Sequence, residues 1–288
     1  MNKTNRALVL PGGGSQGAYA VGALRYTLGV KKREYSHVHG VSVGAVNGAG
    51  VAQWGLEAGE KLVDLWKNLN NSQVAKERTL GYASLAWAPS LMDVSPLRIL
   101  LNKLIDIKSM RSSGIKFSCY AVDLISEDLR TWTQDCEKSQ LVEGIMASSM
   151  APIVYPAIRM NGQVLYDGGI RDVAPIGQAI AAGADEIDVI LAEGVEIAKW
   201  NSEPDRVWNT APRALQIIVR ETIRNDLRTV ELYNQLVSAG VRPDKRFIKI
   251  NLIQPQRALT LDSRDFDPKF IVSLIEQGYA DAKIFWNK

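Results

Sequence analysis

The sequence predicts an α/β protein in which helices cover a mainly parallel sheet. Short apolar runs that suit buried strands alternate with helical patterns from the first residues onward. The composition is that of a globular protein, since 46% of the 288 residues are hydrophobic and 23% are charged. No linker-like stretch divides the chain, so we expect a single domain over residues 1–288.

Two strand–loop–helix units open the chain. The apolar run 7–10 predicts a buried strand, which Pro11 and three glycines end, and a helix pattern follows over 15–28 before Gly29. A second strand is predicted over 37–41, and a helical pattern continues from 45 to about 70. This β-α-β-α order is typical of a parallel sheet.

The middle of the chain adds two hairpins, three helices and a strand. Residues 70–95 are irregular and aromatic-rich, which suits either a loop packed on the core or a lid. Ser95 is expected to be the N-cap of a helix that reaches about residue 105. Hairpins are predicted at 115–125 with 130–134, and at 155–159 with 163–166 around Asn161-Gly162. Helices are expected over 137–150 and 175–182, and a buried strand over 186–191.

The region from about 205 to 288 is expected to be a mainly helical extension. A long helix over 212–237 carries one apolar stripe, made of Leu215, Val219, Ile223, Leu227 and Val230. A second stripe is basic and consists of Arg220, Arg224 and Arg228. Acidic residues are interleaved with these arginines, so a solvated face is favoured and contact with a membrane or partner is the alternative. A strand over 246–252 and a helix over 268–285 complete the chain.

The charge and the cysteines limit the classes of function. A net charge of +3 does not indicate a nucleic-acid partner, although a weakly basic surface could meet anionic lipid. No apolar run is long enough for a transmembrane helix, and no signal peptide fits the N-terminus. Cys119 and Cys136 are expected to be buried thiols, which suits a reducing compartment. We therefore expect a cytoplasmic protein, with peripheral membrane contact left open.

Residues 40–44 have the pattern Gly-Val-Ser-Val-Gly between a predicted strand and a helix. In this context a serine stands on a sharp turn with its hydroxyl exposed, and Gly40 and Gly44 avoid collisions there. Ser42 is therefore the candidate nucleophile. The pattern is common by chance, so its interpretation depends on the residues around it.

Residues 12–17, Gly-Gly-Gly-Ser-Gln-Gly, offer backbone N–H groups at the start of a helix, which favours an anion. We expect Gly12, Gly13, Gly14 and Ser15 to supply an oxyanion hole, with Gly17 supporting the loop. The same residues fit a GxGxxG dinucleotide motif, but the second strand ends in glycine and serine without the acidic residue that a ribose requires. A Walker loop is excluded, because no Gly-Lys-Ser/Thr follows.

A base must accept the proton of the serine. Both histidines, His37 and His39, precede Ser42, so the chain order Ser, Asp, His of an α/β-hydrolase triad is excluded. The base is then a carboxylate or a lysine. Asp167, at a strand end before two glycines, is the first candidate, and Asp123 is the second. A carboxylate is a weak base, so we predict a partly desolvated pocket that raises its pKa.

The chain resembles the patatin-like phospholipase family in four blocks. The blocks are the 12–17 loop, the 40–44 elbow with Asn47-Gly48, the stretch 147–156, and Asp167-Gly168-Gly169, in the family's order. They span residues 6–192. The resemblance implies a three-layer α/β/α fold and a Ser42–Asp167 dyad that hydrolyses acyl esters of lipids or phospholipids, with Gly168 and Gly169 supporting the aspartate and with no metal or cofactor.

The chain departs from the family pattern at two positions. Gln16 stands where an arginine or lysine is usual, and Val173 stands where an asparagine is usual. Neither departure touches the dyad. An acyltransferase on the same dyad, or a catalytically silent lipid-binding protein, remain alternatives to the hydrolase. The sequence does not indicate the oligomeric state.

Overall fold

The computed structural model describes residues 5–77, 92–152, 154–196, 207–242, 244–259 and 266–288. Residues 78–91, which make up most of the segment expected to be either a packed loop or a lid, lie outside these ranges. The strands are β1 (Arg6–Leu10), β2 (His37–Val41), β3 (Lys76–Glu77), β4 (Met92–Asp93), β5 (Lys116–Asp123), β6 (Leu129–Thr133), β7 (Ile158–Met160), β8 (Gln163–Asp167), β9 (Glu186–Ile190) and β10 (Lys249–Ile253). The helices are η1 (Gly14–Gln16), α1 (Gly17–Gly29), α2 (Val43–Trp54), η2 (Gly55–Glu57), α3 (Ala58–Lys67), α4 (Asn71–Val74), α5 (Ser95–Leu104), α6 (Ile107–Ser112), α7 (Lys138–Ser148), η4 (Gly168–Ile170), α8 (Ile176–Ala181), α9 (Val207–Ser238) and α10 (Pro268–Trp286).

The central sheet has the order β10-β9-β1-β2-β5-β8-β7, and β6 pairs with β5. The strands from β10 to β5 run parallel, and β6, β7 and β8 add antiparallel pairs at one side. The Asn161-Gly162 turn has positive φ at both residues, as the predicted hairpin requires. The strand order places the carboxyl ends of β1 and β2 side by side, so their loops can meet there.

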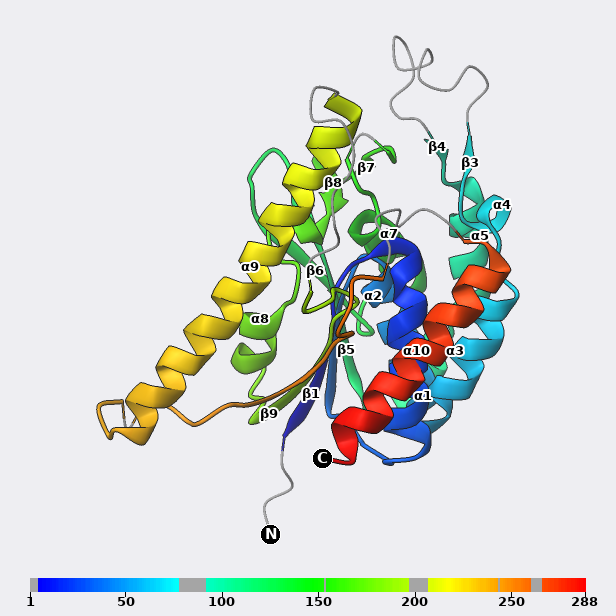
Figure 1. The fold of residues 1–288 in the computed structure, drawn as a ribbon. Helices are drawn as coiled ribbons and strands as arrows, with labels where there is room; N and C mark the ends of the chain where they lie inside the picture. Colours follow the sequence, from blue (N-terminus) through cyan, green and yellow to red (C-terminus); the bar gives the residue numbers. More distant parts are fainter. Residues whose placement is uncertain (1–4, 78–91, 153, 197–206, 243, 260–265) are drawn as a thin grey trace.

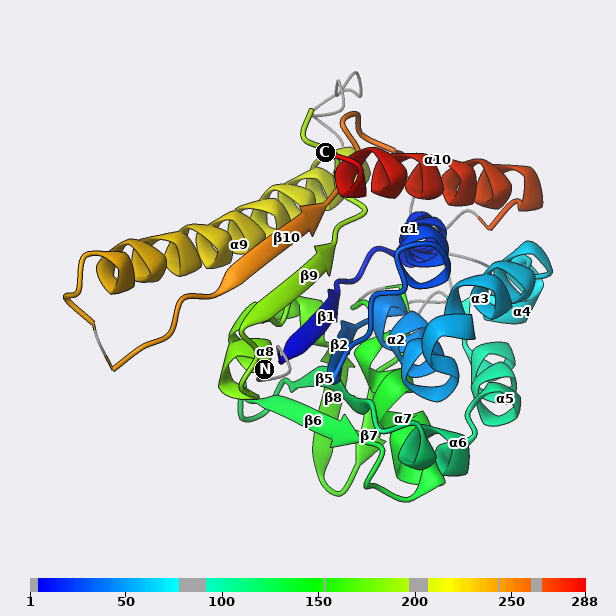
Figure 2. The same cartoon turned by 90° about the horizontal axis from the view of Figure 1, so that it is seen from below.

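Helices cover both faces of the sheet, as Figure 2 shows: α8 and α9 lie on one face, and α1, α2, α3, α7 and α10 on the other. The side chains of β1 alternate accordingly. Leu8 and Leu10 belong to the apolar core beneath α1 and α2, whereas Ala7 and Val9 belong to the core beneath α8 and α9. The predicted α/β class with a mostly parallel sheet and flanking helices is confirmed.

The last helix packs closely against the first (Figure 1). A Cβ atom built on Gly22 of α1 would lie 1.9 Å from the carbonyl oxygen of Ile275, and one built on Gly278 of α10 would lie 1.9 Å from that of Tyr19. Only glycine fits at either position. The carboxyl-terminal segment therefore shares the core of the motif-bearing part, and β10 extends its sheet.

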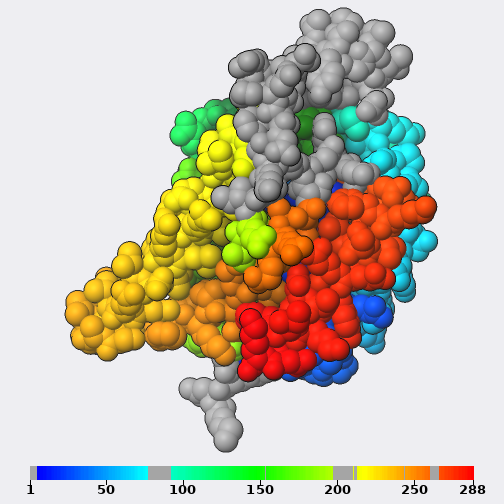
Figure 3. All heavy atoms as spheres, in the orientation of Figure 1, coloured from blue at the N-terminus to red at the C-terminus, as the bar shows by residue number. Residues whose placement is uncertain are grey.

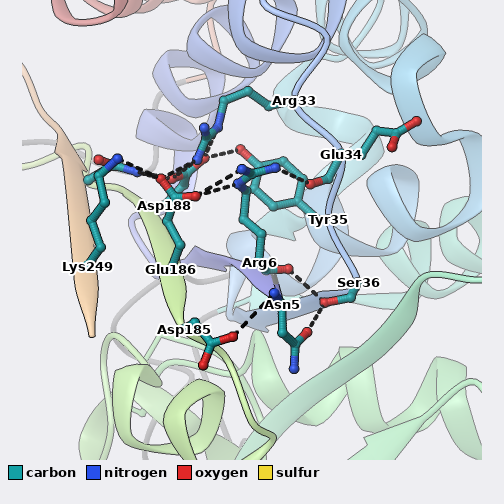
Figure 4. Close-up of polar contacts among 11 residues, drawn as sticks. Asn5, Arg6, Arg33, Glu34, Tyr35, Ser36, Asp185, Glu186, Asp188 and Lys249 are labelled. Carbon is teal, nitrogen blue, oxygen red and sulfur yellow. Dashed lines mark hydrogen bonds and ion pairs between the residues drawn. The ribbon is translucent and has the colours of Figure 1, made fainter. Parts of the chain in front are cut away.

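A buried ion network joins the amino ends of β1, β9 and β10 (Figure 4). Asp188, which is fully buried, accepts two hydrogen bonds of 2.7 Å from Arg33 and one of 2.7 Å from Tyr35. Glu186 pairs with Arg6 at 2.9 Å and with Lys249 at 3.0 Å. Burial raises the pKa of Glu186, but its bonds to Asn251, Lys249 and Arg6 outweigh burial and hold the pKa at about 2. The network fixes β9 and β10 to the first strand.

Two local predictions about helices were wrong. The helix expected from 45 to 70 is broken at Gly55, whose positive φ of 55° turns the chain between α2 and α3. Ser95 lies inside the first turn of α5 instead of capping it. The carboxylate of Asp93 accepts hydrogen bonds from the backbone N–H and the hydroxyl of Ser95.

Three side chains are more or less exposed than the sequence predicted. Cys119 is buried as expected, but Cys136 is partly exposed. On α9, Ile223 and Val230 are buried as predicted, whereas Leu215 is 58% exposed. Residues four positions apart on a helix are rotated by about 40° relative to one another. A stripe with this spacing therefore turns away from the buried face of α9 over several steps. Arg220, expected on a solvated face, is only 17% exposed.

None of the helices in the described ranges combines the length and hydropathy that a membrane span requires.

Candidate active site

Ser42 occupies the turn between β2 and α2, with φ 57° and ψ −130°. This left-handed conformation is rare for a residue with a side chain and marks local strain. Gly44 allows it, because a Cβ there would lie 1.9 Å from the carbonyl oxygen of Leu10. At Gly40 a Cβ would lie 2.4 Å from the carbonyl oxygen of Gly44. Both glycines are thus required for the elbow that the sequence predicted.

Ser148, the last residue of α7, stabilises the turn that carries Ser42. Its hydroxyl accepts a hydrogen bond of 2.9 Å from the backbone N–H of Ser42, and the residue is fully buried. The bond satisfies a backbone donor that would otherwise be left without a partner at the strained turn. It also engages the N–H of Ser42 itself, so that donor does not point at a substrate. The sequence did not reveal this role, although Ser148 lies in one of the four blocks.

The glycine loop faces Ser42, as its place beside β2 predicted. A Cβ built on Gly12 would lie 2.9 Å from the Cβ and 3.6 Å from the Oγ of Ser42. Gly14 has φ 56°, a conformation that glycine adopts without strain. Within the described residues, the backbone N–H groups of Gly13 and Gly14 donate to no protein acceptor. Helix α2 begins directly after Ser42, and its amino end favours negative charge there.

Ser15 is fully buried, and its hydroxyl has no hydrogen-bond partner among the described residues. Its side chain therefore cannot contribute a donor to a ligand at the surface of the loop. Only its backbone remains available for the oxyanion role that the sequence assigned to it.

Asn47 ties the glycine loop to the helix after the elbow. Its side-chain amide donates to the carbonyl oxygen of Gly17 at 3.0 Å, and its oxygen accepts from the indole N–H of Trp66 at 2.9 Å. A Cβ on Gly17 would lie 2.6 Å from the side chain of Val43, so the first turn of α1 packs directly against the start of α2. This contact sets the distance between the loop and Ser42. The sequence pointed to Asn47 only as part of a motif.

Asp167 ends β8, and its carboxyl group meets Ser42. The hydroxyl of Ser42 lies near enough to the carboxyl of Asp167 to lower its pKa, and the backbone N–H of Gly169 donates to the carboxylate at 2.8 Å. Burial raises the pKa of Asp167 to about 6, although the bonds from Ser42 and Gly169 lower it in part. A raised pKa is the direction that the sequence predicted for this base. Gly168 is required for the approach, because a Cβ there would lie 2.5 Å from the carbonyl oxygen of Tyr120.

Asp123, the second candidate base, is held in another arrangement. Its carboxylate accepts hydrogen bonds from the backbone N–H groups of Ile125 and Val164 and from the hydroxyl of Ser126. Burial favours a higher pKa, but these bonds and the guanidinium of Arg130 outweigh it, so the pKa is lowered. Such a carboxylate is a weak base and shapes the turn after β5.

The two histidines have structural surroundings, as expected. The imidazole Nδ1 of His39 lies 2.6 Å from the hydroxyl of Tyr120, and burial lowers the pKa of His39 to about 4. His37 lies 3.1 Å from the hydroxyl of Ser36. Within the described residues neither ring forms a hydrogen bond with Ser42. The carboxyl of Asp167 is thus the base candidate that the fold brings to Ser42.

The two departures from the family pattern have different surroundings. Val173 is 5% exposed and packs in the core beneath α8 and α9, where an apolar side chain is suited. Gln16 is half-buried at the amino end of α1, beside Gly13. Among the described residues no cluster of three or more histidine, cysteine, aspartate or glutamate side chains could hold a metal ion.

Together these features define a class: α/β proteins with a serine on a strained elbow and a neighbouring aspartate at one edge of a mostly parallel sheet. The family model for patatin-like phospholipases matches residues 8–180, which is more than half of the chain. The chain therefore belongs to the patatin-like phospholipase family, which indicates lipid acyl hydrolase activity.

The fold is also similar to that of a solved structure, VipD from Legionella pneumophila. The match has a TM-score of 0.50 and 14% sequence identity, and it covers 99% of this chain and 67% of VipD. At this identity the likeness concerns the fold alone. No curated protein matches the sequence.

Proposed function

We propose that this protein is a serine lipid acyl hydrolase that cleaves carboxylic esters of phospholipids or related lipids through an acyl-enzyme on Ser42. The observation that carries the proposal is the place of the Asp167 carboxyl, whose pKa burial raises to about 6, next to the hydroxyl of Ser42 on its strained turn. Family membership supports a lipid ester as the substrate.

Asp167 acts as the base in this mechanism. It accepts the hydroxyl proton of Ser42 while the serine oxygen bonds to the ester carbonyl carbon. The tetrahedral intermediate then collapses, the bond to the leaving alcohol breaks, and the proton passes from Asp167 to that alcohol. Water repeats the sequence on the acyl-enzyme and releases the fatty acid. A pKa near 6 leaves the carboxylate mostly ionised at pH 7 and makes it a stronger base than an exposed aspartate.

The backbone N–H groups of Gly13 and Gly14 stabilise the oxyanion. Their freedom from protein acceptors within the described residues supports this role. Loss of one such donor typically costs about 100- to 1000-fold in turnover. The N–H of Ser42 is excluded from this set, because it donates to Ser148.

Hydrolysis of a short-chain nitrophenyl ester and of a phospholipid panel, read by mass spectrometry, tests the proposal. Ser42→Ala and Asp167→Asn are expected to abolish both activities while the chain remains folded. A fluorophosphonate probe should label the wild type and leave Ser42→Ala unlabelled. Asp123→Asn is the matched carboxylate control and should retain activity if its turn folds normally. Substantial turnover by either dyad variant would refute the dyad, and failure of the probe to label the wild type would favour a silent lipid-binding protein.

A further inference from the structure

The first turns of α9 present large apolar side chains to solvent. Leu215, Ile217 and Ile218 are 58%, 57% and 60% exposed. Figure 1 shows this end of α9 extending past the carboxyl ends of the parallel strands, the edge at which Ser42 lies. In Figure 3 the helix forms an outer flank of the molecule. These three residues, which we call the α9 apolar patch, lie outside the segment that the family model matches.

Arginines lie on one side of the α9 apolar patch, next to Ile217. Ile217 and three arginines, Arg213, Arg220 and Arg224, line a small hollow of about 130 Å³, together with Gln216, Glu193 and Glu221. The guanidinium of Arg220 already has an acidic partner, because it donates to Glu193 at 2.8 Å. Arg213 reaches only the amide oxygen of Gln216, at 3.4 Å, among the described residues. Arg224 is 47% exposed and lies 3.9 Å from its acidic neighbour Glu221, so its guanidinium remains accessible.

The hollow is close to the oxyanion loop. A Cβ built on Gly13 would lie 3.9 Å from the Cβ of Ala192, and the next residue, Glu193, forms the ion pair with Arg220. The arginines therefore lie beside the wall of the candidate active site. A surface held at α9 would be brought to the edge at which Ser42 opens.

We propose that the first half of α9 docks the protein onto an anionic lipid bilayer, with the α9 apolar patch entering the interfacial region and Arg213 and Arg224 contacting lipid phosphates. Aliphatic side chains next to basic residues on one helix are typical of interfacial helices. Guanidinium groups bind phosphate oxygens in a bidentate manner. Protein–protein interfaces are typically enriched in aromatic residues, and none of the described residues that line this hollow is aromatic.

This inference rests on the proposed function, since a bilayer is where the lipid substrate is found, but binding can be measured without turnover. In flotation with vesicles, the wild type and Ser42→Ala should bind phosphatidylcholine mixed with phosphatidylglycerol and bind pure phosphatidylcholine poorly. High salt should weaken binding, because the Debye length falls to about 3 Å at 1 M.

Two paired variants test the two parts of the surface. Arg213→Gln with Arg224→Gln is expected to lower the affinity for anionic vesicles by about fivefold per arginine. Ile217→Asn with Ile218→Asn should lower binding to the same vesicles, including at low salt. Both variants should keep wild-type hydrolysis of a soluble nitrophenyl ester, which shows that the fold and the site are intact.

A matched control lies at the other end of the same helix. Leu232 and Leu236 are 60% and 41% exposed, so Leu232→Asn with Leu236→Asn removes similar apolar surface away from the site. This control should bind vesicles like the wild type. Equal binding of the wild type to neutral and anionic vesicles, no binding to either, or an equal loss in the control would each overturn the proposal. Absence of ester hydrolysis by the wild type would instead refute the proposed function, and flotation would still report on docking.

Discussion

The substitution Asp167→Asn should stabilise the protein at neutral pH while it abolishes the activity. The pKa of Asp167 is about 6 in the folded protein, against an ordinary value of 3.8. The difference is about two units, and each unit corresponds to about 1.4 kcal/mol, so ionisation of this carboxyl costs the folded state about 3 kcal/mol. The folded chain binds the proton more tightly than the unfolded chain, so stability falls as pH rises from about 4 through 6. Asparagine has no such ionisation.

The assay is urea unfolding of both proteins at pH 4 and pH 8, with the free energy of unfolding extrapolated to water. The stability of Asp167→Asn relative to the wild type should rise by about 3 kcal/mol between the two pH values, because other carboxyl groups cancel in the difference. Ser42→Ala is the control: it keeps the carboxyl and removes one bond that lowers the pKa, so the pH dependence should persist and shift to higher pH. A stability difference that stays constant with pH would show that the carboxyl is not desolvated and would refute the reasoning.

Three further predictions concern the site and the buried ion network. The turnover of a soluble ester should fall below half its maximum as pH drops through about 6, and Asp172→Asn, which removes another aspartate whose pKa burial raises to about 6, should leave that profile unchanged. A profile that moved with Asp172 would assign the titration elsewhere. Ser148→Ala should lower kcat by about 10- to 100-fold with little change in KM, because the N–H of Ser42 loses its acceptor and the nucleophile shifts. Ser148→Thr should restore part of kcat. An unchanged kcat in the alanine variant would contradict the positioning role of Ser148. Asp188→Asn should cost about 2–3 kcal/mol in urea unfolding, because it weakens the charge-assisted hydrogen bonds of Arg33, which keeps only Glu186 as an acidic partner among the described residues, and a loss below about 1 kcal/mol would argue against a stabilising network.

Local pattern and topology were sufficient to select the candidate site residues from the sequence. Glycines on both sides of a serine, between a strand and a helix, indicate a sharp turn that exposes the serine hydroxyl. Neighbouring parallel strands place the loops that follow them at the same edge of the sheet. The order of the histidines in the chain, both before Ser42, excluded an α/β-hydrolase triad. The ranking of Asp167 over Asp123 also agrees with the structure, although the sequence alone could not say which carboxylate is surrounded by N–H donors and which is desolvated.

The contacts that the sequence did not predict join residues far apart in the chain. Ser148 binds the backbone of a residue 106 positions earlier, and no periodicity or motif rule indicates that contact. The exposure of Leu215 was missed for a related reason, since a helical stripe does not reveal where the sheet beneath it ends. The sequence pattern predicted one long helix through Gly55, because the apolar spacing continues across the break.

The sequence by itself determined the α/β class, the order of most elements, the elbow, the glycine loop and a short set of candidate bases, because these depend on hydrophobic period and on the backbone freedom of glycine. Tertiary structure decided the rest. It joined Asp167 to Ser42, buried that carboxyl, assigned the N–H of Ser42 to Ser148 and placed the arginines of α9 beside the oxyanion loop. Burial and hydrogen-bond partners arise only when distant segments pack together, so pKa values and positioning contacts are properties of the fold.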